Sequence, residues 1–185
     1  ISGPSPAVGK SFVSCNLAAI IAQTGQRVLL VDADMRKGYL NKMFRLEVNN
    51  GLSDLLAGKI DLAAATHATE VDNLHVITRG QIPPNPSELL MHSNFTKFLE
   101  KVSGQYDLII VDTPPILAVT DAALVGRQAG TSLIVTRFGV NAAKEILITK
   151  RRFEQNGIVV KGAIFNAVER KASAYGYGNY SYYQY

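Results

Sequence analysis

The residues best suited to chemistry in this sequence are Gly9, Lys10 and Ser11, which end a turn-forming segment that begins at Gly3. A Gly-Lys-Ser turn at the start of a helix binds nucleotide phosphates. Its backbone N–H groups point at the phosphates, its lysine reaches the outer ones, and its hydroxyl ligates magnesium. The regular motif has a glycine five residues before the Gly-Lys pair, where this chain has Pro4. Because the triplet also occurs by chance, the assignment needs support from elsewhere in the chain.

Carboxylates at the ends of two apolar runs give that support. Asp32 and Asp34 follow the run 28–31, and Asp112 follows the run 108–111. In an open parallel sheet, ligands bind beyond the carboxyl ends of the strands, so these aspartates are expected beside the phosphate loop. Each aspartate alone could be a helix cap or a surface residue. Together with Gly-Lys-Ser they predict a site for a nucleotide and magnesium, in which one carboxylate holds the metal and another orients or deprotonates an attacking hydroxyl.

The elements that must position these residues alternate along the chain. Strands are predicted at 27–31, 74–78, 107–111, 132–136 and 159–165. Helices are predicted at 10–24, 41–44, 53–56, 87–91, 93–102, 121–128 and 142–155. Gly25 is the expected end of the first helix. Strands that alternate with helices indicate an α/β fold with a mainly parallel sheet and helices on both faces.

Length and composition bound the class of protein. A chain of 185 residues with 47% hydrophobic content suits one globular domain with a core. The net charge of +4 is mild, and the basic run 150–152 falls on a predicted helix, so nucleic acid is not an expected partner. No apolar run approaches the ~18–20 residues of a membrane span. The single cysteine, Cys15, excludes a disulfide framework. Because Ile1 and Ser2 look like the stub of a strand, we expect a missing upstream region.

The end of the chain differs from the rest in composition. It carries no charge and no aliphatic side chain larger than alanine. It holds six of the eight tyrosines of the chain: Tyr175, Tyr177, Tyr180, Tyr182, Tyr183 and Tyr185. Such a segment cannot fold alone, so we expect a domain over residues 1–171 and a flexible tail over 172–185. Beside an ATP site, the tyrosines are predicted phosphoacceptors, and a sticky aromatic tail is the alternative.

The motifs resemble those of one family. The segments 6–11, 28–36 and 108–115 are similar to the three nucleotide motifs of the bacterial tyrosine kinases, which share the second motif with the MinD/ParA ATPases. The segment 79–90 is similar to one typical of the branch fused to polysaccharide co-polymerases, the Wzc/Etk type. The resemblance spans essentially the whole chain, tail included. It implies a P-loop NTPase-like three-layer sandwich, as in MinD/ParA, with ATP/ADP and Mg²⁺ as ligands.

The resemblance also implies roles for individual residues. The implied nucleotide contacts are Pro6, Ala7, Val8, Gly9, Lys10, Ser11, Phe12 and Asn166. The implied metal ligands are Ser11, Asp34 and Asp112. Lys10 and the three aspartates form the implied catalytic set, with Asp34 as the base for a tyrosine hydroxyl and Asp32 assisting at the metal.

Several of these positions keep a second interpretation. Asn166 is either an adenine contact or an ordinary turn residue. Arg36 and Lys37 either neutralise phosphate charge or are solvated loop cations. The loop departs from the family at Ala7 and Val8, which resist the positive φ that glycine permits.

The function implied is an ATP-dependent protein-tyrosine kinase that autophosphorylates its tail in trans within a ring of identical subunits. The implied partners are a cognate low-molecular-weight tyrosine phosphatase, the machinery of exopolysaccharide or capsule export, and the inner membrane, reached through the upstream region from its cytoplasmic face. The alternatives are a MinD/ParA-like switch ATPase and an ATP-gated assembly module. Ser5 stands where the MinD/ParA signature has lysine, which weakens the first alternative.

Overall fold

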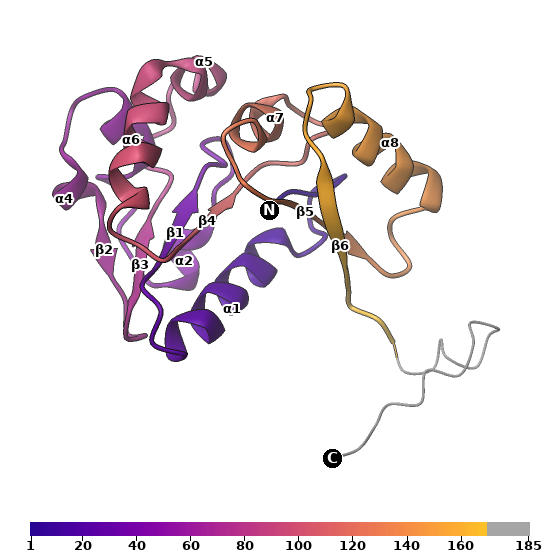
Figure 1. Ribbon diagram of the computed structural model, residues 1–185, viewed down its shortest axis with the longest axis horizontal. Coiled ribbons are helices and arrows are strands. Elements are labelled where there is room, and N and C mark those ends of the chain that lie inside the picture. Colours follow the sequence, from indigo (N-terminus) through magenta and orange to yellow (C-terminus); the bar gives the residue numbers. More distant parts are fainter. Residues whose placement is uncertain (170–185) are drawn as a thin grey trace.

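A computed structural model gives the structure of the chain and describes residues 1–169 (Figure 1). The six predicted phosphoacceptor tyrosines therefore lie outside the described residues, as does the predicted boundary at residue 171. None of the helices in the described range has the length and apolar character needed to cross a membrane.

A four-stranded sheet with the order β2-β3-β1-β4 forms the centre of the fold. Its strands are β1 (Val28–Asp32), β2 (His67–Ala68), β3 (Leu74–Ile77) and β4 (Leu108–Asp112). β1 pairs in parallel with β3 and β4, and the short β2 pairs antiparallel with β3. A second, parallel sheet consists of β5 (Ser132–Arg137) and β6 (Val160–Asn166). All five predicted strands are present and mainly parallel, and the prediction omitted only β2.

Helices connect these strands. They are α1 (Lys10–Gln23), α2 (Leu40–Met43), α3 (Leu52–Leu56), α4 (Leu62–Ala65), α5 (Pro86–Met91), α6 (Ser93–Ser103), α7 (Asp121–Gly126) and α8 (Ala143–Glu154). Seven of these helices were predicted, with ends that differ by one or two residues, and α4 was not. Gly25 follows α1 with φ +89° and donates its N–H to the carbonyl of Ala22, as expected of a residue that ends a helix.

The alternation of side chains along β1 creates the layers. Val28 and Leu30 belong to the core on the side of α1 and α2, whereas Leu29 and Val31 belong to the core with α3, α5 and α6. Figure 1 shows α1 below the sheet and α5 and α6 above it. A third apolar cluster joins α7 and α8 to β5 through residues such as Phe153. The predicted three-layer α/β sandwich is therefore confirmed.

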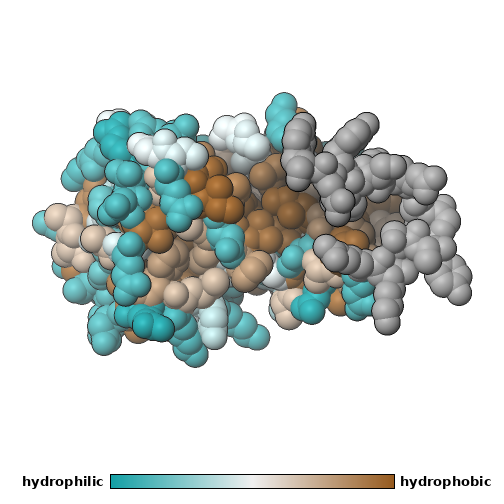
Figure 2. Space-filling model, turned by 90° about the horizontal axis from the view of Figure 1, so that it is seen from below, coloured by the Kyte–Doolittle hydropathy of each residue, from teal (hydrophilic) through white to brown (hydrophobic). Residues whose placement is uncertain are grey.

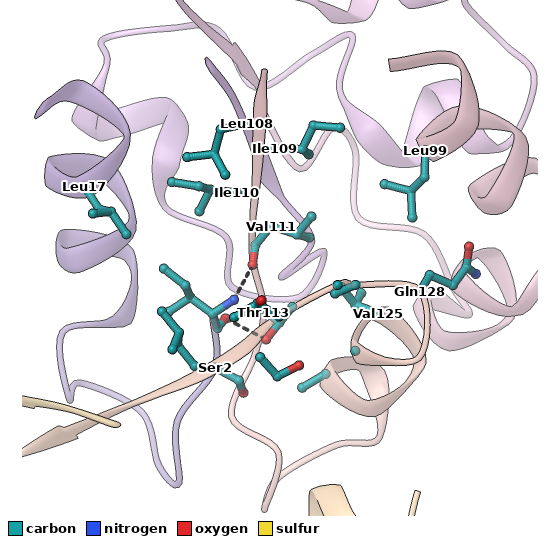
Figure 3. Close-up of a pocket in the computed structure, with 18 of the residues that line it drawn as sticks. Ser2, Leu17, Leu99, Leu108, Ile109, Ile110, Val111, Thr113, Val125 and Gln128 are labelled. Carbon is teal, nitrogen blue, oxygen red and sulfur yellow. Dashed lines mark hydrogen bonds between the residues drawn. The ribbon is translucent and has the colours of Figure 1, made fainter. Parts of the chain in front are cut away.

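The two sheets meet at the first two residues. The Ile1 ammonium donates to the carbonyl of Val111 at 2.8 Å, and the Ser2 N–H donates to the carbonyl of Leu133 at 3.0 Å. In the other direction, the carbonyl of Ser2 accepts from Val135 at 2.8 Å. Beyond this junction a cavity of about 530 Å³ separates the facing edges of β4 and β5 (Figure 3). Ile1 and Ser2 thus occupy the strand-like position that the sequence suggested.

The free cysteine lies inside the α1 side of the core. Cys15 is buried, and its Sγ lies 3.5 Å from Sδ of Met43, so it links α1 to α2. Burial, together with the charges of Asp112 and Asp32, raises the pKa of the thiol to about 12. The opposite side of α1 exposes Phe12 and Ile20 to solvent, and Figure 2, a view from the side on which α1 lies, shows hydrophobic residues in the middle of this face.

Candidate functional site

The phosphate-loop sequence connects the junction of the two sheets to the start of α1. Gly9 has φ +94° and Ala7 has φ +59°, and α1 begins at Lys10. Ala7 therefore adopts the left-handed conformation that we expected it to resist, at a cost of about 1–2 kcal/mol. Val8 is fully buried and anchors the loop, whereas Pro6 and Phe12 are exposed beside it.

Three side chains from the β5–β6 end of the molecule hold this loop. Arg137 donates to the carbonyl of Ala7 at 3.1 Å, and Asn141 donates to the Ser5 hydroxyl at 3.0 Å. The Asn166 amide donates to the carbonyl of Val8 at 3.0 Å. A Cβ on Gly9 would collide with this amide, so glycine is needed there for space as well as for its φ angle.

Two of these three contacts, those of Arg137 and Asn141, were not predicted from the sequence. Arg137 is the last residue of β5, at the sheet edge where the phosphate loop was expected, so its position could have indicated this contact. No feature of the sequence indicated the contact of Asn141 with the loop. Asn166 does lie at the phosphate loop, where it fixes the backbone, and its contact with adenine remains a prediction.

Lys10, Ser11 and Asp112 come together at the start of α1. The Ser11 hydroxyl donates to Oδ2 of Asp112 at 2.6 Å, and the Ser14 hydroxyl donates to Oδ1 at 3.0 Å. Ser14 was not predicted, although it lies three residues beyond Ser11 on the same helical face. Burial raises the pKa of Asp112, and the two hydroxyls partly offset this rise. Burial lowers the pKa of Lys10, while the charges of Asp112 and Asp34 act against this shift.

Asp32 shapes the loop that carries Asp34. It is fully buried, and its two oxygens accept from the N–H groups of Asp34 and Leu40, each at 3.2 Å. Burial, followed by the charge of Asp112, raises its pKa well above the ordinary value. A Cβ on Gly38 would press against the Asp32 carboxylate, so the loop needs glycine there. In this structure Asp32 therefore fixes the backbone, and its assistance at a metal remains a prediction.

Asp34 is the more accessible of the two carboxylates. It is half-buried, and its Oδ1 accepts from the N–H groups of Arg36 at 3.2 Å and Lys37 at 2.9 Å. Within residues 1–169 its Oδ2 accepts no hydrogen bond, so one oxygen is available to a ligand.

Arg36 has a partner that neither of its two sequence interpretations included. Its Nε lies 3.3 Å from Oδ2 of Asp121, whose side chain is fully buried, and its Nη2 donates to the Ser87 hydroxyl at 3.1 Å. Ser87 in turn donates to Oδ1 of Asp121 at 2.6 Å. The neighbouring Lys37 is exposed, as a solvated cation would be.

The arrangement fits a magnesium nucleotide. Magnesium prefers hard oxygen ligands and keeps several of them from phosphates and water, so a hydroxyl and one or two carboxylates suffice on the protein side. Ser11, Asp112 and Asp34 supply such oxygens beside the Lys10 ammonium. In the described part of the chain, no group of three or more His, Cys, Asp and Glu side chains could hold a metal by itself.

Known proteins are similar to this chain in sequence and in fold. A family model described as an AAA domain matches residues 6–149. The chain is 53% identical over 185 residues to the tyrosine-protein kinase wzc of Salmonella typhimurium, which covers 100% of this chain and 26% of that protein. The solved kinase domain of the Escherichia coli tyrosine kinase ETK is similar, with a TM-score of 0.90 and 52% identity over 96% of this chain and 70% of that one.

A more distant likeness concerns the fold alone. The septum site-determining protein MinD from Pyrococcus horikoshii, solved as a complex with Mg-ADP, has a TM-score of 0.74 and 23% identity over 89% of this chain and 67% of that one. This supports the P-loop NTPase-like architecture expected from the sequence. The chain spans about a quarter of the length of the curated relatives that it matches.

Proposed function

Because this chain belongs to the family of bacterial tyrosine-protein kinases, we propose that it transfers the γ-phosphoryl group of ATP to tyrosine hydroxyls. The observation that carries this proposal is the convergence at one sheet edge of Lys10, the Ser11–Asp112 pair and the accessible oxygen of Asp34. A phosphate grip beside a carboxylate with a free oxygen can both hold ATP and accept a proton from an attacking hydroxyl.

In the proposed reaction the phenol oxygen of tyrosine attacks the γ-phosphorus, its P–O bond forms as the β–γ bond breaks, and ADP leaves. Asp34 accepts the phenolic proton on Oδ2, while Oδ1 remains held by the backbone of its own loop. Lys10 and the loop N–H groups neutralise the charge on the transferring group. Ser11 and Asp112 would hold Mg²⁺, which would supply positive charge against the negative charge of the phosphates.

We propose the tail tyrosines, Tyr175 to Tyr185, as the substrate. Fourteen extended residues span at most ~50 Å, so a tail could enter the site of a neighbouring subunit in a ring. Each phosphotyrosine adds about −1.5 to −2 charges, so full modification would add roughly −9 to −12 to a tail that starts neutral. Repulsion of that size would weaken packing between subunits.

The biological setting that we propose rests on the same family membership. We propose regulation of exopolysaccharide or capsule synthesis and export at the cytoplasmic face of the inner membrane. There the chain would act with export machinery and with a cognate low-molecular-weight phosphatase that resets the tail.

The first test is incubation of the chain with ATP and Mg²⁺ followed by intact-mass spectrometry. We expect successive additions of one phosphate, mapping between Tyr175 and Tyr185 and absent from Lys10→Met. Asp34→Asn should lower the rate strongly while ATP still binds, because the base is lost and the phosphate grip remains.

Other results of this test would favour an alternative function or a different base. Release of ADP without any mass change would favour the switch ATPase over the kinase. ATP binding with neither hydrolysis nor transfer would favour the assembly module. If Asp34→Asn phosphorylated its tail at the wild-type rate, the assignment of Asp34 as the base would be wrong.

A further inference from the structure

The loop that presents Asp34 makes most of its hydrogen bonds with itself. Asp32 accepts from the N–H groups of Asp34 and Leu40, and Asp34 accepts from those of Arg36 and Lys37. These bonds set the local shape of the loop. Beyond Asp34, the buried side chain of Met35 packs into the core with α3, α5 and α6.

The side chain of Arg36 adds a polar connection to this apolar one. Its guanidinium reaches Asp121, at the first position of α7, and Ser87, in the first turn of α5. Ser87 and Asp121 are also bonded to each other, so the three side chains form a closed triangle. The residues are 51 and 85 positions away from Arg36 along the chain, and the triangle therefore joins three separate segments.

The burial of Asp121 gives the triangle its stability. A carboxylate that is fully buried needs partners for its charge, and Arg36 and Ser87 supply them. The planar guanidinium binds Asp121 and Ser87 through two different nitrogens, whereas a lysine would have to reach both from a single nitrogen. The Arg36 side chain is 38% exposed, and it reaches its two partners through different nitrogens, Nε to Asp121 and Nη2 to Ser87.

We propose that Arg36 is a positioning residue, which fixes the loop of Asp34 against α5 and α7 and so aims the carboxylate at the phenolic proton. This inference rests on the proposed kinase function. It also gives a role to the segment 79–90, whose Ser87 completes the triangle. Supporting contacts of this kind typically change activity by about 10–100-fold when they are removed.

The first measurement is hydrogen exchange of the segment 33–40, which needs no activity. The amides of Asp34, Arg36 and Lys37 donate within the loop, so their exchange reports its order directly. We expect Arg36→Ala and Asp121→Asn to speed this exchange by about tenfold or more. Ser87→Ala should speed the exchange less, because Arg36 keeps its contact with Asp121. Arg151→Ala, an exposed arginine on α8, is the matched control and should leave the segment unchanged.

The second measurement is tail phosphorylation at saturating and limiting ATP. Arg36→Ala should lower kcat by about 10–100-fold with nearly unchanged KM for ATP, because the phosphate grip is intact. Arg36→Lys should recover only part of the rate. The double variant Arg36→Ala/Asp121→Asn should be no slower than Arg36→Ala alone, since the two residues act through one contact.

The outcomes separate this inference from the proposed function. Unchanged exchange in Arg36→Ala and Asp121→Asn would overturn the positioning role. A raised KM for ATP with unchanged exchange would also overturn it, and would favour a direct contact of Arg36 with phosphate. If the exchange results hold but the wild-type chain transfers no phosphate to tyrosine, the triangle stands as a loop anchor and the kinase proposal fails.

Discussion

Asp112 is 2% exposed, and its carboxylate accepts from the hydroxyls of Ser11 and Ser14. Before any metal arrives, the protein holds this charge away from water, and burial raises its pKa accordingly. Asp32, also buried, adds repulsion nearby. The carboxylates that would organise magnesium therefore destabilise the metal-free fold, as often happens at functional sites.

Asp112→Asn should consequently be more stable than the wild type when no metal or nucleotide is present. The amide oxygen can accept from Ser11, and the amide group can donate to the Ser14 hydroxyl, which can rotate to accept. We expect a gain of about 0.5–2 kcal/mol, together with loss of phosphoryl transfer. Thermal unfolding in EDTA at neutral pH measures the first effect, and tail phosphorylation measures the second.

Asp112→Ala is the matched control, because it removes the charge but leaves both hydroxyls without their acceptor and opens a gap. It should be less stable than Asp112→Asn. Equal destabilisation of the two variants would show that the charge of Asp112 is not a source of instability.

At the scale of elements, a single ion pair ties the starts of two neighbouring central strands. Arg27 precedes β1 and Asp107 precedes β4, and their side chains meet at 2.8 Å. The backbone N–H of Arg27 also donates to Asp107 at 2.8 Å. These hydrogen bonds lower the pKa of Asp107 from its ordinary value of 3.8 to about 2.

This shift predicts how acid affects the pair. A carboxylate whose pKa is lowered by folding stabilises the fold above its unfolded pKa, and this contribution is lost as pH falls from about 3.8 through about 2. The melting temperature of Asp107→Asn should therefore fall less than that of the wild type between pH 5 and pH 2. The difference should be small, because both side chains are exposed, and it should shrink in high salt. Identical acid profiles for the two proteins would contradict it.

The elements that sequence could predict are those with strong patterns of their own. The apolar runs that became β1 and β4 and the long α1 were all predicted, because their periodicity does not depend on distant partners. β2 has only two residues, His67 and Ala68, and exists through its pairing with β3, so no pattern marks it. α4 did carry a signal that was overlooked, since Asp61 caps it by accepting from Ala64.

In the candidate site, too, some residues could be predicted from the sequence and others could not. Lys10, Ser11 and Asp112 were predicted because motif spacing and strand ends place them at one edge. The contact of Arg36 with Asp121 could not be predicted, because it joins positions 85 residues apart and depends on how α7 packs beside the loop. Only the folded backbone brings those two side chains together.

At the scale of the whole molecule, the phosphate loop depends on both sheets. It leaves the junction formed by Ile1 and Ser2, and side chains at the end of the β5–β6 sheet hold its backbone. Asp112, by contrast, comes from β4 in the four-stranded sheet. The distance between the loop and its carboxylate is therefore set by how the two sheets meet, on either side of the cavity.

The contact between Cys15 and Met43 gives the molecule a built-in chemical reporter. The sequence has one cysteine, and a thiol with a pKa of about 12 that is buried under α2 should be almost inert to disulfide reagents. At pH 8 the folded chain should react with such a reagent at least about 100-fold more slowly than the urea-unfolded chain, since labelling must wait for α2 to lift from α1. Equal rates would show that this helix is already open. Because α2 begins where the loop of Asp34 ends, the reaction rate of this thiol, followed by absorbance alone, would time how often that loop detaches and whether bound nucleotide closes it.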